Sequence, residues 1–442
     1  MEFKQIKEII SAACEKHGVK EFEIYYSVGE NVSAETLKDE ISAFSSGESG
    51  RIAFRCIVNE HAGYSSTSCF DENELEDLVL RAVENAKVIE NDDVVVIFKG
   101  SESYAKTTAP EPQVIDASVL KEKALALQKK TYAVDPSVVD GTQTAAISFR
   151  DEIYLYNSHG LELSNRVGMT GCYIEAVVNK DGESRNNFEF ADSIFGENAE
   201  ELPAKAVNGA LEKIGATELP TGKYNVVIDG TQMRSILSAF SPSFSAKNAL
   251  LGMSLLAGKE GEKIAADIIT ITDDPMREGC PVQTNFDQEG VATYKKNVVE
   301  NGILKTLLYD LTTAYKAGKE TTGNGVRGGG VMPYNFSISA GEKSFEELFQ
   351  KAENGVYVTT VKGLHAGANA ITGDFSIESE GFLIKDGKKA EPVKSFVISG
   401  NFFELLKNID SLSNQVKWGI PGGFTVFGSP DILVKDMTVA VK

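Results

Sequence analysis

The order of strand-like and helix-like segments constrains the fold of this chain most strongly. Apolar and polar residues alternate in 22–28 and in 52–58, as half-buried antiparallel strands require. Apolar residues at helical spacing occur before these segments, in 3–13, and after them, in 75–86. Because strands and helices do not alternate regularly as they do in βαβ units, we predict an α+β fold with mixed, largely antiparallel sheets and flanking helices.

Three units are predicted along the 442 residues: 1–100, 113–218 and 222–442. The first two are separated by Lys99–Gln113, a polar stretch with two prolines that is typical of a linker. In both units a run of strands is followed by a helix that starts with Glu-Leu, at Glu74-Leu75 and at Glu201-Leu202. This repeated order suggests an internal duplication in the N-terminal half.

Local signals in the third unit predict two tight hairpins and one capped helix. Asn301-Gly302 and Asp386-Gly387 lie between β-rich runs, and both dipeptides tolerate the positive φ angles of a two-residue turn. Asn401 precedes the stripe Phe402, Leu405, Leu406 and Ile409 and is expected to cap that helix.

Charge and composition exclude several classes of protein. With 44 basic and 64 acidic residues the formal net charge is −20, which disfavours direct binding to nucleic acid. No apolar stretch approaches the length of a membrane span, and the first residues lack the pattern of a secretory signal. Five widely spaced cysteines without a CxxC pair suggest reduced thiols. We therefore expect a soluble, cytoplasmic protein.

Familiar catalytic motifs are missing from the sequence. The four histidines, at 17, 61, 159 and 365, are too far apart for the HExxH pattern of a zinc protease. The chain also lacks the GxSxG elbow of a serine hydrolase and the GxxxxGK[ST] loop that binds nucleotide phosphates. We therefore assign no catalytic residue and no metal ligand to this chain.

Two polar segments are candidates for binding a substrate. Asp287 and Glu289 in FDQEG stand two residues apart, so on an extended segment both carboxyl groups would share one face and could poise a proton or hold a cation. A solvated strand end is an equally good interpretation of this pair. The run GLHAGANAITGDFS, residues 363–376, is rich in small and polar residues and predicts a loop beside a cleft. Its candidate residues are His365, Asn369, Thr372 and Asp374.

The order of motifs in the third unit resembles a known family. FDQEG is followed by VVENGILKTLLYD, TTGNGVR, GLHAGANAITGDFS and FVISGNFFELL, and this order is similar to the C-terminal region of the TldD/PmbA family, also called modulators of DNA gyrase. The resemblance covers residues 224–442, and TGDFS and ISGN resemble the PmbA (TldE) branch. Asn324 and Arg327 of TTGNGVR join the candidate substrate-binding residues on this basis.

What the resemblance implies is a cytoplasmic metalloprotease that acts on small or unfolded peptides. In the sister TldD branch a helix carries HExxxH, and a later cysteine completes a zinc site. Here the corresponding helix begins GTQMRSILSAF, and no cysteine follows Cys280. The resemblance therefore implies a metal-free subunit whose TldD-like sister holds the zinc. Two alternatives stay open: a non-enzymatic peptide-binding or scaffold homodimer, and a peptidase that uses a weakly held metal.

Overall fold

The structure is a computed structural model that describes residues 1–89 and 94–441. Its N-terminal half contains one six-stranded antiparallel sheet in the order β3-β2-β1-β4-β5-β6. The strands are β1 Glu21–Leu37, β2 Glu40–Val58, β3 His61–Thr67, β4 Gln143–Asn157, β5 Glu162–Lys180 and β6 Glu183–Ala191. Each of the first two predicted units contributes three strands, and β1 pairs with β4 along its length.

Four helices cover one face of this sheet. They are α1 Phe3–Lys16, α2 Glu72–Val88, α3 Ala117–Tyr132 and α4 Glu197–Leu211. The even-numbered apolar residues of β1 point toward them: Ile24 packs with α1 and α2, and Val32 packs with α3 and α4. The order helix, three strands, helix occurs twice, in keeping with the repeated order of elements seen in the sequence.

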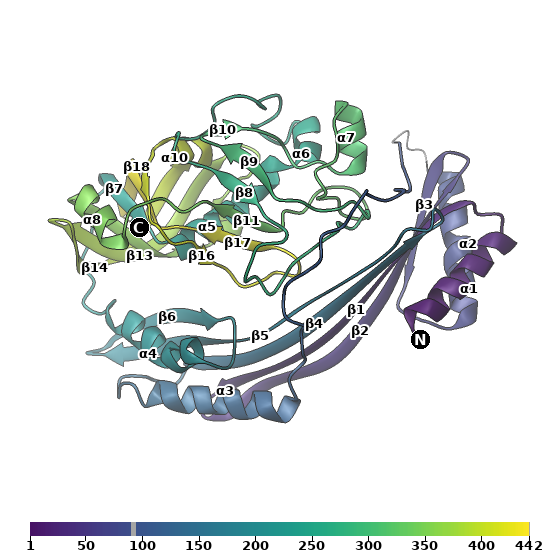
Figure 1. The fold of residues 1–442 in the computed structure, drawn as a ribbon. Coiled ribbons are helices and arrows are strands. Elements are labelled where there is room, and N and C mark those ends of the chain that lie inside the picture. Colours follow the sequence, from purple (N-terminus) through teal and green to yellow (C-terminus); the bar gives the residue numbers. More distant parts are fainter. Residues whose placement is uncertain (90–93, 442) are drawn as a thin grey trace.

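The C-terminal unit lies on the other face of the sheet. Figure 1 shows the long strands as a curved sheet, with the helices on its outer side and the C-terminal unit within the curve. The odd-numbered residues of β1, such as Tyr25, point toward the C-terminal unit and pack there with Phe286. Both faces of the sheet are therefore covered where the two halves meet.

Two further sheets build the C-terminal unit. One has the order β10-β9-β8-β11-β17-β16, and the other has the order β14-β13-β12-β7-β18-β15, with β14 also paired to β18. That extra pairing closes the second sheet on itself. Most pairings in the structure are antiparallel, while β7–β12 and β11–β17 are parallel, so the predicted α+β class with mixed, largely antiparallel sheets is confirmed.

The elements of the C-terminal unit follow in chain order. The strands are β7 Gly222–Ile228, β8 Ile271–Asp273, β9 Lys296–Glu300, β10 Ile303–Leu304, β11 Asn335–Ile338, β12 Gly355–Lys362, β13 Asp374–Lys385, β14 Lys388–Asn401, β15 Ile409–Leu412, β16 Lys417–Trp418, β17 Val426–Ser429 and β18 Ile432–Val441. The helices are α5 Gly230–Phe240, η1 Ser241–Phe244, α6 Ala246–Leu250, α7 Leu311–Ala317, α8 Phe345–Ala352, α9 Leu364–Gly367 and α10 Phe402–Lys407.

The predicted local signals of this unit are confirmed. Asn301 and Gly302 both have positive φ angles, 48° and 77°, in the turn between β9 and β10. Asp386 and Gly387 do the same between β13 and β14, with φ angles of 49° and 69°. The side chain of Asn401 accepts a hydrogen bond from the backbone N–H of Phe403 at 3.1 Å and so caps α10.

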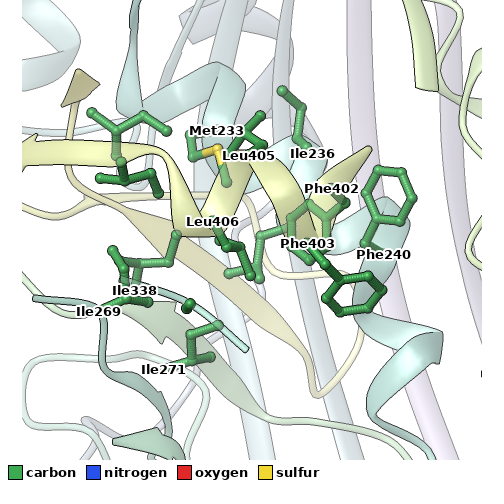
Figure 2. Close-up of a cluster of buried hydrophobic side chains, with 14 of the residues drawn as sticks. Met233, Ile236, Phe240, Ile269, Ile271, Ile338, Phe402, Phe403, Leu405 and Leu406 are labelled. Atoms are coloured by element: carbon green, nitrogen blue, oxygen red, sulfur yellow. The ribbon is translucent and has the colours of Figure 1, made fainter. Parts of the chain in front are cut away.

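A large hydrophobic core joins the two sheets of the C-terminal unit. Figure 2 shows α5 and α10 packed together above the apolar side chains of β8 and its neighbours. At the centre Phe240 stacks on Phe402, with ring centroids 4.5 Å apart, and both side chains are fully buried. The apolar stripe predicted for α10 is therefore part of the main core.

No helix in residues 1–89 and 94–441 is long and apolar enough to cross a membrane. Four of the five cysteines are buried as unpaired thiols, and Cys69 is exposed.

Removing the ring of Phe402 should destabilise the C-terminal unit strongly. We expect Phe402→Ala to lower its free energy of unfolding by about 3–5 kcal/mol, because the cavity left among α5, α10 and β8 cannot collapse fully. Phe195→Ala is the matched control, since that ring lies on the surface and its loss should change the free energy by less than about 0.5 kcal/mol. Urea unfolding of both variants measures the difference, and equal effects would contradict this account of the core.

Candidate functional site

FDQEG and TTGNGVR fold against each other into one unit, which we call the clasp (residues 286–290 and 321–327). Asp287 Oδ1 accepts the backbone N–H groups of Glu289 and Val291, each at 2.9 Å, and its Oδ2 accepts that of Gly325 at 2.7 Å. The N–H of Gly290 donates to the carbonyl of Asp287 and closes a turn. Asp287 and Glu289 therefore lie within a turn and not on the extended segment considered for them.

The glycines of the second motif allow the clasp to close. A Cβ atom at Gly325 would overlap the carboxyl group of Glu289. A Cβ atom at Gly323, whose φ is +65°, would lie 2.7 Å from the carbonyl oxygen of Ala292. Glu289 Oε2 in turn accepts the N–H of Leu311, the first residue of α7, at 2.8 Å. Both motifs are needed to form the same small structure.

Both acids of the clasp are buried and hold protons unusually tightly. Asp287 is 1% exposed and Glu289 is 6% exposed, so the interpretation as a solvated strand end does not apply. Burial raises the pKa of Asp287 to about 7, against the opposing effect of its backbone donors. Burial and the neighbouring Asp287 raise the pKa of Glu289 to about 8. Near neutral pH the pair therefore changes charge readily.

Arg327 ties the clasp to the N-terminal sheet. Its guanidinium group donates to the carboxylate of Glu23, which is fully buried on β1. Arg55, the cross-strand neighbour of Glu23 on β2, places its Nε 3.0 Å from the same carboxylate oxygen. Sequence reasoning missed Glu23 and Arg55. The available signal was a pair of opposite charges on the polar faces of the two predicted strands.

Asn324 belongs to a neighbouring polar network within the C-terminal unit. Its amide nitrogen donates to Asp273 Oδ2 at 2.8 Å and to the carbonyl of Met332 at 2.9 Å. Lys296 donates to the same oxygen of Asp273 at 2.9 Å. Asn324 is fully buried, and its own oxygen has no hydrogen-bond partner. The side chain of Asn324 therefore joins the clasp to this network.

A groove runs between the N-terminal sheet and the C-terminal unit beside the clasp. It consists of two adjoining cavities of about 480 Å³ each, which share Tyr64 and Gly328. One contains Arg55, Lys247, Glu289 and Asp310; the other contains Tyr25, Arg51, Gln288 and Arg327. We call this the interdomain groove. Glu289 lines the first cavity and Arg327 the second, whereas Asp287 and Asn324 line neither.

The other four predicted residues lie elsewhere. His365, Asn369, Thr372 and Asp374 are exposed on the loop around α9, and none of them lines the interdomain groove. Asn369 Oδ1 accepts the N–H of Ile371 at 2.9 Å, and Asn401 donates to Asp374 Oδ1 at 3.0 Å. These polar groups therefore shape their own loop. A role for them in substrate binding stays a prediction.

Helix α5 occupies the position at which the sister branch is implied to carry zinc. Its polar side chains are those of Thr231, Gln232, Arg234, Ser235 and Ser238. This set does not fit zinc, which takes thiolate, imidazole or carboxylate ligands in proteins. In the part of the chain that the structure describes, no three His, Cys, Asp or Glu side chains gather as a metal site would require.

Comparison with known proteins identifies the family. Family models of the PmbA/TldA metallopeptidase match the chain three times: domain 1 over residues 22–86, the central domain over 110–214 and the C-terminal domain over 221–441. The chain belongs to the PmbA/TldD metallopeptidase family. The family predicted from the motif order is therefore confirmed.

Relatives match along most of the chain. A metalloprotease of Methanothermobacter thermautotrophicus is 28% identical over 399 residues, which are 87% of this chain and 86% of the relative. The crystal structure of a proposed modulator of a DNA gyrase from Thermotoga maritima has a TM-score of 0.90 and 29% identity, covering 99% of this chain and 100% of the other. TldE from Thermococcus kodakarensis, at 24% identity and a TM-score of 0.87 over 98% of this chain and 99% of its own, shares the fold.

The buried acids predict an unusual dependence of stability on pH. A carboxyl group whose pKa is raised by folding binds its proton more tightly in the folded state, so stability falls as the pH rises from the unfolded pKa to the folded one. With folded values of about 7 and about 8, the free energy of unfolding should drop by at least about 2 kcal/mol between pH 5.5 and 8.5.

Glu289→Gln tests the origin of this effect. The amide carries no charge, so the variant should lose roughly half of the pH dependence and should be more stable than the parent above pH 8. Denaturant unfolding at a series of pH values measures both quantities. Glu84→Gln, on exposed α2, is the control and should follow the parent. An unchanged slope in Glu289→Gln would show that this carboxyl group is not the source.

Proposed function

We propose that this chain is the metal-free, TldE-like subunit of a cytoplasmic TldD/PmbA-type metalloprotease that acts on small or unfolded peptides. A TldD-like sister chain with HExxxH supplies the zinc and the hydrolytic step. This chain contributes the surface that holds the peptide.

The interdomain groove carries this proposal. It is made of two adjoining cavities that share Tyr64 and Gly328, and its walls come from separate units of the chain. Its lining mixes the acids Glu289 and Asp310 with the cations Arg55, Lys247 and Arg51. An unfolded peptide presents backbone amides and charges of both signs, and a groove of this kind offers partners for all of them.

The side chains of α5 support the metal-free part of the proposal. Arg234 extends from this helix and donates to the carbonyl of Trp418. A fixed guanidinium group repels a divalent cation, and the nearby polar side chains are hydroxyl and amide groups, which bind zinc poorly. The zinc ligands required for hydrolysis would then come from the sister chain.

An exposed apolar segment beside the groove supports a protein partner. Leu250, Leu251, Met253 and Leu255 are all exposed within six residues at the end of α6. Leu250 and Leu251 also line the mouth of the interdomain groove. Apolar patches of this kind mark sites of protein contact. A sister chain bound here would shield them and close the groove around a peptide.

Reconstitution with a TldD-like sister tests the proposal. We expect little cleavage of an unfolded peptide by either chain alone and at least about a tenfold higher rate for the mixture. In the mixture, Glu289→Gln in this chain should lower kcat/KM by about tenfold, while Glu84→Gln should leave it unchanged. Cleavage by this chain alone that a chelator abolishes would favour a weakly held metal. Peptide binding without any gain in cleavage would favour the scaffold homodimer.

The apolar segment makes a separate prediction about assembly. Leu251 is 61% exposed, and Leu251→Glu places a charge where the sister chain would bury a leucine. We expect this change to weaken the complex by at least about tenfold in size-exclusion or light-scattering titrations. Val88→Glu, at a position 75% exposed on α2, is the control and should bind like the parent. Equal binding by both variants would place the contact elsewhere.

A further inference from the structure

A second cavity lies on the opposite half of the N-terminal sheet. It has a volume of about 340 Å³ and opens between β6 and α4 on one side and loops of the C-terminal unit on the other. It shares no lining residue with the interdomain groove. This volume lies within the range of about 300–1,000 Å³ that is usual for small-molecule sites. We call it the Trp418 cavity.

One wall of the Trp418 cavity carries an arginine without an acidic partner. The guanidinium carbon of Arg277 lies over the ring of Trp418, 3.7 Å from the ring centroid. Its Nε is buried and has no hydrogen-bond acceptor, and no carboxylate in residues 1–89 and 94–441 lies within ion-pair distance. A guanidinium group supported by an aromatic ring is a ready partner for a carboxylate, which it can bind through two parallel hydrogen bonds.

The indole that holds Arg277 is itself fixed. Trp418 lies on β16, and its backbone carbonyl accepts a hydrogen bond from Arg234 of α5. Its ring packs on Gly428 of β17, where a Cβ atom would lie 2.7 Å from the ring. Arg277 therefore rests on a rigid support, and a carboxylate in the cavity would bind the terminal nitrogens of its guanidinium group rather than the buried Nε.

The opposite wall carries two acidic groups and Lys205, whose ammonium group is paired with Glu201 at 2.8 Å. Glu189 of β6 is half-buried, accepts one hydrogen bond from Asn187 at 3.1 Å and forms no ion pair among the described residues. Burial raises the pKa of Glu189, so this carboxyl group would gain from a bound cation. Asp192 lines the same side. Apolar side chains also line the cavity: Met169, Phe190, Leu202 and Val426.

We propose that the Trp418 cavity binds a small zwitterion, an α-amino acid or dipeptide with an apolar side chain. Its carboxylate pairs with Arg277, its ammonium group faces Glu189 and Asp192, and its side chain lies against Met169 and Leu202. A phosphate dianion is disfavoured, because Glu189 and Asp192 would repel it and Lys205 is already paired with Glu201. The proposal concerns a site separate from the groove and does not depend on the proposed protease subunit.

The chain contains a single tryptophan, and it lies in this cavity, so intrinsic fluorescence reports binding directly. We expect leucine or leucyl-leucine to produce a saturable change in fluorescence, with a Kd below about 1 mM. Leucinamide lacks the carboxylate and N-acetyl-leucine lacks the ammonium group, so each should bind at least about tenfold more weakly. Calorimetry of the full chain supplies an independent measure of the same affinities.

Variants at the two walls separate binding from folding. Arg277→Gln should weaken leucine binding by at least about tenfold without weakening leucinamide further. Glu189→Gln should weaken leucine but leave N-acetyl-leucine unchanged, so it tests the site even if Arg277→Gln fails to fold. Arg81→Gln, on exposed α2, should bind like the parent. The proposal is overturned if leucine and its dipeptide give no saturable signal, if leucinamide binds as tightly as leucine, or if inorganic phosphate binds more tightly than either.

Discussion

The junction of the two halves of the molecule depends on one buried carboxylate, that of Glu23. On the open face of an isolated sheet Glu23 would lie in water beside its cross-strand neighbour Arg55. Once the C-terminal unit covers that face, Glu23 loses its water, and an uncompensated carboxylate there would cost several kcal/mol. Arg327 supplies the second guanidinium group. Removing either arginine would leave Glu23 undercompensated, so the sheet and the C-terminal unit depend on each other.

The same junction explains the chemistry of the clasp. Arg327 follows Gly325 by two residues, so its bond to Glu23 also fixes the loop whose N–H group donates to Asp287. The segment predicted as a linker also contacts the clasp, because the hydroxyl of Tyr104 donates to the carbonyl of Gly290 at 2.7 Å. Enclosed between the two, the acids of the clasp lose their water, and this loss is what raises their pKa values.

Local signals in the sequence predicted local structure well, and the reason is physical. The Asn301-Gly302 turn and the cap at Asn401 depend on the conformations of a few adjacent residues. The burial of Glu23 depends instead on the distant segment that covers the polar face of β1. The alternation of apolar and polar residues along a strand shows only which residues share a face. The polar run around His365 was predicted to border a cleft. In the structure Asn401 donates hydrogen bonds to Thr372 and Asp374 of this run, so its polar groups also serve to hold the loop in shape. The composition of a loop does not show whether its polar side chains face a ligand or stabilise the loop itself.

The repeated order of elements gives the two cavities a common origin. Because β1 and β4 pair at the centre of the sheet, β2 and β3 on one side correspond to β5 and β6 on the other. The interdomain groove lies against β2 and β3, and the Trp418 cavity lies against β5 and β6. The two sheets of the C-terminal unit differ in strand order, so this unit cannot make the same contacts with both halves of the N-terminal sheet. It therefore packs tightly along the middle strands, through Tyr25 and Leu155, and leaves a cavity at each end with a different lining.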